Sequence, residues 1–147
     1  MNPIQRCGLL AATALACSAF APAATAQEIE QQSSNGVTYV TGGVGSEERQ
    51  AMRELSPQFN VQLMFADRGS GDYRSGQSVE VRDMRGNVRM QAEDTGPLLY
   101  AQLPPGRYRV TATVDGQRQQ RTISVGRGGS QSAAFYWDAE PPVSMGR

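Results

Sequence analysis

Three arginines on two neighbouring stretches are the residues of this chain best suited to binding chemistry. Arg107 and Arg109 occupy alternate positions of the stretch 107–114, and Arg118 follows in the stretch 117–125. Guanidinium groups bind carboxylates and phosphates through paired hydrogen bonds. We therefore expect these arginines to contribute to a ligand-binding surface for an anionic glycan or an acidic protein patch. The competing interpretation is an ordinary wet sheet face, because such side chains are common on solvated strands.

The two stretches that carry these arginines have the pattern of a β-hairpin. Polar positions 107, 109, 111 and 113 alternate with apolar positions 108, 110, 112 and 114, which predicts a half-buried strand. Asp115-Gly116 is a strong two-residue turn signal. A two-residue turn places Tyr108 opposite Ile123 and Val114 opposite Gln117. The polar face then joins residues 107, 109, 111 and 113 to residues 124, 122, 120 and 118.

Composition leaves few groups for catalysis. All 14 basic residues are arginine, histidine is absent, and the two cysteines are Cys7 and Cys17. Carboxylates are then the only plausible general acids and bases, with Glu93 and Asp94, or Glu47 and Glu48, as candidates. Adjacent residues of a strand point to opposite faces, so Glu93 and Asp94 could not flank one bond. We expect a non-catalytic protein; the alternative is a carboxylate-based glycoside hydrolase or another small extracytoplasmic enzyme.

Two glycine-rich loops resemble ligand sites only superficially. The stretch 41–45 precedes a predicted helix, where free backbone N–H groups can attract phosphate. Glu47 and Glu48 already occupy that positive pole, and no phosphate-binding motif is present. The loop 67–76 has glycine where a calcium loop needs carboxylates. We interpret both as structural connections, and we expect no metal and no cofactor.

The first 26 residues have the order of a secretory signal peptide. A short n-region with Arg6 precedes the apolar stretch 7–20, and Ala24-Thr25-Ala26 offers a cleavage site before Gln27. We expect an exported protein, periplasmic or secreted, with no transmembrane helix after cleavage. The alternative is a lipoprotein signal that ends in Ala14-Leu15-Ala16 and leaves Cys17 acylated.

The charge of the mature chain gives no support for nucleic-acid binding. Removal of Arg6 leaves 13 arginines against 14 acidic residues, a net charge of −1. Nucleic-acid and membrane-surface partners are attracted by a strong positive charge, which this chain lacks. The expected partner is an envelope glycan or protein.

The remaining patterns predict one small β domain over residues 37–137. Residues 27–36 are polar, which predicts a flexible lead-in before the domain. Residues 138–147 are expected to form a loose tail after it. Ser46 is a candidate N-cap for a short helix that Ser56-Pro57 ends, with Met52, Leu55 and Phe59 on its apolar stripe. Further strands are predicted at 37–40, 59–66, 78–83, 88–93, 98–103 and 131–137. The expected fold is mainly β, a single antiparallel β-sandwich of about seven strands with one short N-terminal helix.

Alternation within these strands also predicts the core. Phe59, Val61, Leu63 and Phe65 share one face of their strand. We expect Leu63, Phe65, Leu103, Tyr108 and Val110 to meet in one buried cluster between two sheets.

Two motifs resemble a known family. Val79-x-Val81-x-Asp83-x-x-Gly86-x-Val88 and Leu103-Pro-Pro-Gly106-x-Tyr108-x-Val110 are similar to the carboxypeptidase regulatory-like domain, a transthyretin-like or starch-binding-like sandwich. The resemblance covers about residues 60–137, so the segment 42–59 stays unexplained. It implies an accessory, scaffolding or carbohydrate-binding module. The activity of the related hydroxyisourate hydrolases is not implied, because the chain has no histidine and ends Ser-Met-Gly-Arg. A Lys–Asn cross-link is excluded by the absence of lysine.

Overall fold

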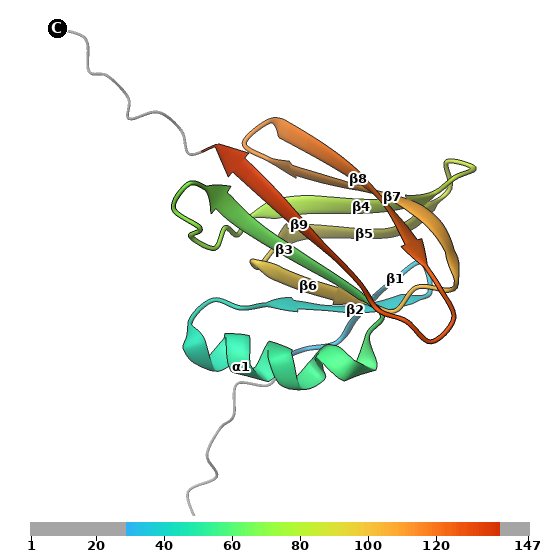
Figure 1. Ribbon diagram of the computed structural model, residues 1–147, viewed down its shortest axis with the longest axis horizontal. Helices are drawn as coiled ribbons and strands as arrows, with labels where there is room; N and C mark the ends of the chain where they lie inside the picture. Colours follow the sequence, from blue (N-terminus) through green and yellow to red (C-terminus); the bar gives the residue numbers. More distant parts are fainter. Residues whose placement is uncertain (1–28, 139–147) are drawn as a thin grey trace, which may run out of the picture.

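The computed structural model describes residues 29–138, and within them the chain is mainly β with one short helix (Figure 1). This confirms the predicted class, but the described part holds nine strands and not about seven. The strands are β1 (Gln32–Ser34), β2 (Val37–Gly42), β3 (Val61–Arg68), β4 (Gln77–Asp83), β5 (Val88–Thr95), β6 (Leu98–Ala101), β7 (Gly106–Val114), β8 (Gln117–Val125) and β9 (Gln131–Asp138). The helix α1 (Ser46–Leu55) continues into a 3-10 turn, η1 (Ser56–Gln58).

The strands form two sheets. Sheet A has the order β1-β2-β6-β3-β9, and sheet B has the order β5-β4-β7-β8. Most neighbours are antiparallel, as predicted, but β3 and β9 pair in parallel. The prediction of a purely antiparallel arrangement is therefore wrong at this edge. The chain reaches β9 from β8 in the other sheet, so the direction of β9 is not dictated by a hairpin with β3.

The β7–β8 hairpin has the register that its sequence predicts. Tyr108 lies opposite Ile123, and Val114 lies opposite Gln117. The turn is made by Asp115 and Gly116, whose φ angles are 48° and 77°. Both values are positive, as a type I′ turn requires, and this turn matches the twist of the two strands.

The main core lies between the two sheets. Leu63, Phe65, Leu103, Tyr108 and Val110 all belong to it, as predicted, and Val110 and Phe65 are fully buried. The Tyr108 hydroxyl donates to the carbonyl of Pro104 at 2.5 Å, which ties the start of β7 to the preceding turn. Alternation in the hairpin and in β3 therefore builds the two walls of one core.

Helix α1 covers part of the outer face of sheet A, and this explains the segment 42–59. Met52 is fully buried against Val40, Phe59 and Tyr100, with Leu55 beside them. Phe59 lies in this second cluster, as the stripe with Met52 and Leu55 predicts. Its other predicted place, on the strand face of Val61 in the main core, is wrong. The reason is that β3 begins only at Val61, after η1 has turned the chain.

The start of α1 also differs from the prediction. Gly45 is the N-cap, Ser46 is the first helical residue, and no side chain caps the helix. The Glu48 carboxylate instead accepts from the backbone N–H of Gly43 at 3.0 Å. A Cβ on Gly42 would lie 2.4 Å from an oxygen of that carboxylate, so a larger residue there would displace the Glu48 side chain.

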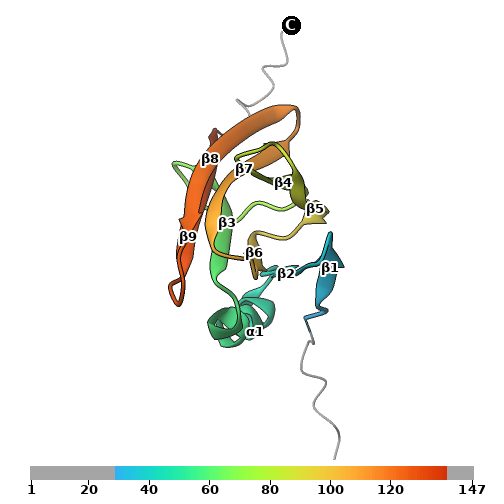
Figure 2. The same cartoon turned by 90° about the vertical axis from the view of Figure 1, so that its right-hand side faces the viewer.

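The predicted flexible lead-in contains a strand in its described part, residues 29–36. This strand, β1, pairs with β2 from Gln32 opposite Tyr39 to Ser34 opposite Val37. Ser34 also accepts from the backbone N–H of Gln91 at 3.0 Å, and Asn35 donates to the carbonyl of Val88 at 3.3 Å. These side chains bridge the edge strands β1 and β5 of the two sheets. Figure 2 shows the two strands near each other.

Several predictions fall outside the described residues. They are the signal peptide at 1–26, the alternative acylation at Cys17 and the tail beyond Asp138. In the part that is described, no helix has the length and apolar character needed to span a membrane.

Candidate functional site

The three predicted arginines lie on the outer face of sheet B. The β7–β8 register places Arg107 beside Ser124, Arg109 beside Thr122 and Thr113 beside Arg118. Their neighbours along the strands, Tyr108 and Val110, point into the core. The structure therefore puts the three side chains on one exposed face, as the alternation predicts.

Strands β4 and β5 widen this face and create a shallow hollow, which we call the sheet-B hollow. Its volume is about 400 Å³. Arg109 and Arg118 line it, whereas Arg107 lies farther along β7 and does not. The other lining residues are Ser78, Val79, Glu80, Arg82, Gln91, Glu93, Thr111, Thr113 and Gln120.

The hollow contains two carboxylates: Glu80, which was not a predicted candidate, and Glu93, which was considered only as a catalytic group. Glu80 accepts from Arg82, and its second oxygen accepts from Gln91 at 3.0 Å. The hydrogen bond from Arg82 and, after it, that from Gln91 lower the pKa of the Glu80 carboxyl below its ordinary value. Glu93 accepts from the Ser78 hydroxyl. The face is therefore mixed in charge and rich in hydroxyl and amide groups.

Two of its arginines are available to a ligand. Within residues 29–138, neither Arg109 nor Arg118 forms an ion pair, whereas Arg82 is engaged by Glu80. Gln120 donates to Thr111 at 3.2 Å, which leaves further donors and acceptors in the middle of the face. The arrangement can hold a carboxylate or sulfate group beside several sugar hydroxyls.

The residues that sequence reasoning missed come from a strand that is distant in the sequence. Glu80 lies opposite Thr111 of β7, and Arg82 lies opposite Arg109. The alternation of Val79 and Val81 predicts that Glu80 faces outward, and this was the available signal. It could not reveal that β4 is the neighbour of β7, because strand order depends on long-range packing.

The two carboxylate pairs considered for catalysis lie in different parts of the fold, one on α1 and the other on β5. Glu48 binds the N–H of Gly43, and the exposed Glu47 lies beside it on the outside of sheet A. Asp94 has a φ of 51°, in a part of β5 where the pairing with β4 is irregular. Glu80 and Glu93 share a hollow, and the lowered pKa of the Glu80 carboxyl does not suit the general acid of a glycosidase.

The two glycine-rich loops have structural roles. The N–H of Gly43, which could have met a phosphate, is taken by Glu48. Asp67 binds the guanidinium of Arg74 at 2.7 Å, and Arg74 also binds Asp115 at 2.9 Å. This arginine joins the loop 67–76 to the tip of the β7–β8 hairpin, so the Asp67 carboxylate serves an ion pair.

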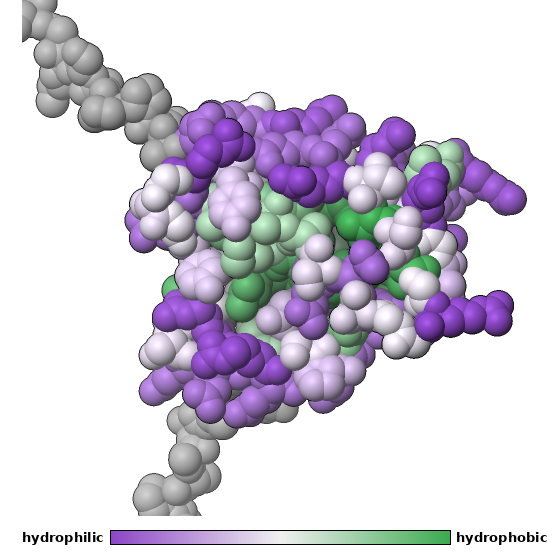
Figure 3. Space-filling model, in the orientation of Figure 1, coloured by the Kyte–Doolittle hydropathy of each residue, from purple (hydrophilic) through white to green (hydrophobic). Residues whose placement is uncertain are grey.

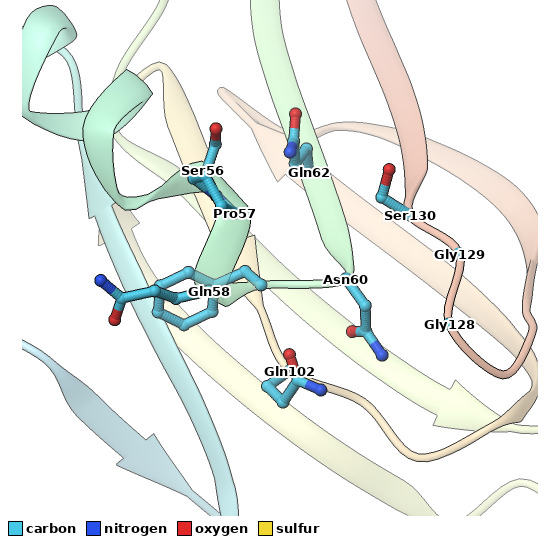
Figure 4. Close-up of a pocket in the computed structure, with 10 residues that line it drawn as sticks. Ser56, Pro57, Gln58, Asn60, Gln62, Gln102, Gly128, Gly129 and Ser130 are labelled. Atoms are coloured by element: carbon cyan, nitrogen blue, oxygen red, sulfur yellow. The ribbon is translucent and has the colours of Figure 1, made fainter.

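A second hollow lies where η1, β3 and the loop before β9 meet (Figure 4). We call it the amide hollow, because Gln58, Asn60, Gln62 and Gln102 line it, and its volume is about 500 Å³. Asn60 is occupied: it donates to the carbonyl of Leu103 at 2.7 Å and accepts from the N–H of the same residue at 2.9 Å. Figure 4 shows Gln62 and Ser130 on neighbouring chain segments, with Gly128 and Gly129 in the adjoining loop.

Comparisons with known proteins add no identity. No protein-family model matches the sequence. The search of curated proteins also gives no match. The function of the protein is therefore inferred from its residues and their arrangement.

Proposed function

We propose that the protein is an exported, non-catalytic binding module of the cell envelope whose sheet-B hollow binds an acidic, hydroxyl-rich glycan. The observation that carries the proposal is the meeting of four strands at one face, where two arginines without ion pairs in the described chain stand among hydroxyl, amide and carboxylate groups. Arginine suits the acidic groups of such a glycan. Serine, threonine, glutamine and glutamate suit its hydroxyls.

The family resemblance and the compartment belong to the same proposal. A carboxypeptidase regulatory-like domain would act as an accessory or scaffolding module, which agrees with a chain that lacks histidine and lysine. The two-sheet arrangement with its core between the sheets is compatible with the sandwich of that family. Export follows from the order of residues 1–26.

Binding to a defined acidic polysaccharide tests the proposal. We would measure the affinity of the protein for alginate, with dextran as the neutral comparison, at low and at physiological salt. Combined Arg107→Ala, Arg109→Ala and Arg118→Ala substitution should weaken alginate binding at least about tenfold, with a larger loss at low salt.

A matched variant separates this site from general charge. Arg53→Ala, Arg85→Ala and Arg127→Ala remove the same charge from exposed positions elsewhere and should leave affinity within about twofold. An equal loss in both triple variants, or no alginate binding by the unsubstituted protein, would refute the proposed site.

A further inference from the structure

Strand β9 has one edge without a strand partner in the described part of the chain. It pairs with β3 on one side and ends sheet A on the other. Its free edge faces β8, the last strand of sheet B, and the two lie side by side in Figure 2 without backbone pairing. In a strand with one neighbour, alternate N–H and C=O groups point away from that neighbour and stay available.

A hollow separates the two edges over part of their length. This edge hollow has a volume of about 590 Å³ and lies between residues 121–124 of β8 and residues 131–134 and Tyr136 of β9. At one end Gln119 donates to the carbonyl of Tyr136. Arg121 places its guanidinium 5.7 Å from the centre of the Phe135 ring. Of the described residues lining the hollow, Arg121 is the only charged one, and within residues 29–138 it has no ion pair.

Another hollow, distinct from the amide hollow, lies on the outer face of β9. This outer hollow measures about 350 Å³ and is lined by Met64, Leu98 and Tyr100, with Gln62, Leu63 and residues 132–134. Figure 3 shows hydrophobic residues gathered in the middle of this face, where β3 and β9 run in Figure 1. Helix α1 covers the β2 side of the face and leaves this part open.

The same three small residues separate the two hollows. Ser132, Ala133 and Ala134 line both of them. Natural edge strands are usually blocked by charges, proline or a covering segment, and β1 and β5 cover one another in this way through Ser34 and Asn35. From Gln131 to Trp137, β9 has neither a charged residue nor proline, and its last residue, Asp138, pairs with Arg68 at 3.6 Å. It is therefore a strand edge left open between two side-chain hollows.

We propose that β9 receives an extended peptide of a partner protein as an added strand. Backbone hydrogen bonds to β9 would supply affinity, and alternate side chains would enter the two hollows. On the outer face an apolar side chain can pass over Ala134 to Met64. On the other face a carboxylate meets Arg121. The ligand class is a peptide with alternating apolar and acidic residues.

Charge distinguishes this partner from a second copy of the chain. Pairing of two β9 strands would place residues 131–137 of one copy beside Arg121 of the other. That stretch contains no acidic residue, and Asp138, at the end of β9, already pairs with Arg68. A foreign peptide with carboxylates on one face satisfies Arg121, and a second copy paired through β9 does not.

The test uses a synthetic peptide, acetyl-Val-Glu-Val-Glu-Val-Glu-amide, and the protein from residue 27 onward. We expect measurable binding by calorimetry and slower hydrogen exchange of the amides in 131–136. Two further peptides keep the same side chains and carry N-methyl groups on alternate residues, either on the valines or on the glutamates. One of these two methylated registers should lose binding and the other should not, because only alternate N–H groups face β9. Replacing the three glutamates of the peptide by lysine should weaken its binding.

Two protein variants locate the contact. Arg121→Gln should weaken peptide binding roughly three- to fivefold, with Arg107→Gln as the matched control on the far face. Ala134→Lys should weaken it at least about tenfold, because a charged side chain blocks the edge, with Gln120→Lys as its control. Unchanged unfolding midpoints would show that the folds are intact.

The proposal is overturned if both N-methylated registers bind as well as the parent peptide, or if the peptide does not bind. It is also overturned if the free protein is a dimer that already protects 131–136 and that Ala134→Lys dissociates. Because these residues lie outside the sheet-B hollow, the result is independent of the glycan proposal.

Discussion

Val110 occupies a fully buried position in the middle of β7. Val110→Ala removes two methyl groups from the space between the sheets and leaves a cavity. We expect a loss of about 1–3 kcal/mol in the free energy of unfolding, measured by chemical denaturation. Arg107→Ala, on the exposed face of the same strand, is the control and should change stability by less than about 0.5 kcal/mol. An unchanged midpoint for Val110→Ala would contradict the inward position of this side chain.

Glu80 links the charge of the sheet-B hollow to pH. Its pKa is lowered in the folded protein, first by the hydrogen bond from Arg82. A lowered pKa means that the folded state favours the carboxylate, so this stabilisation is present above the unfolded-state pKa of about 4.3. It is lost as the pH falls through the folded-state value.

Glu80→Gln should therefore flatten the acid limb of the stability curve below about pH 4.3. The effect at neutral pH should be under about 1 kcal/mol, because the pair is partly exposed. Denaturation at a series of pH values gives the measurement, with Glu54→Gln on the exposed side of α1 as the control. If Glu80→Gln lowered the free energy of unfolding by the same amount at all pH values, Glu80 would act through packing and not through its charge.

The turn between β7 and β8 depends on backbone conformation. Gly116 has a φ of 77°, and no atom lies within 4 Å of where its Cβ would be. Gly116→Ala should therefore cost about 1 kcal/mol through left-handed strain alone. Gly126→Ala is the matched control, because that glycine has equal space and no positive φ in the range that disfavours side chains. Equal stability of the two variants would contradict the type I′ turn.

The same hairpin shows what could be predicted from the sequence. Alternation and Asp115-Gly116 are local signals, and they were sufficient for the complete register of β7 and β8. The neighbours of the hairpin are decided by contacts between distant segments. For this reason the place of β4 beside β7, and with it Glu80 in the hollow, could not be predicted.

The apolar stripe predicts helix α1, and Ser56-Pro57 correctly predicts its end at Leu55, but the predicted N-cap is wrong. The stripe correctly identified Met52 and Leu55 as contacts to the protein interior. Serine is a common N-cap, so the sequence predicts Ser46 in that position. In the structure the N-cap is Gly45, which has a φ of 83°, and the Glu48 side chain binds the backbone just before the helix. Tertiary contact of Glu48 with the end of β2 replaced a local capping preference.

In the whole molecule, two packed sheets leave two faces of different chemistry. The outer face of sheet B is polar and bears the paired Glu80 and Arg82. It also bears Arg109 and Arg118, which form no ion pair within residues 29–138. The outer face of sheet A is covered by α1 near β2 and is apolar near β9. We therefore propose that one domain binds a glycan on one side and a peptide on the other, which suits a module that joins two envelope components.

Such a role requires export, and the amino-terminal residues predict how it occurs. Apolar residues follow Arg6, and Ala24-Thr25-Ala26 ends the segment a few residues before the described fold begins at residue 29. Expression of the full chain in a bacterial host should give an extracytoplasmic form whose intact mass begins at Gln27. Ala26→Lys should block this cleavage because the site needs a small residue, and Cys17→Ser is the control that should leave it unchanged. A mass that begins at a lipid-modified Cys17, lost in Cys17→Ser, would instead establish a lipoprotein anchored to the membrane.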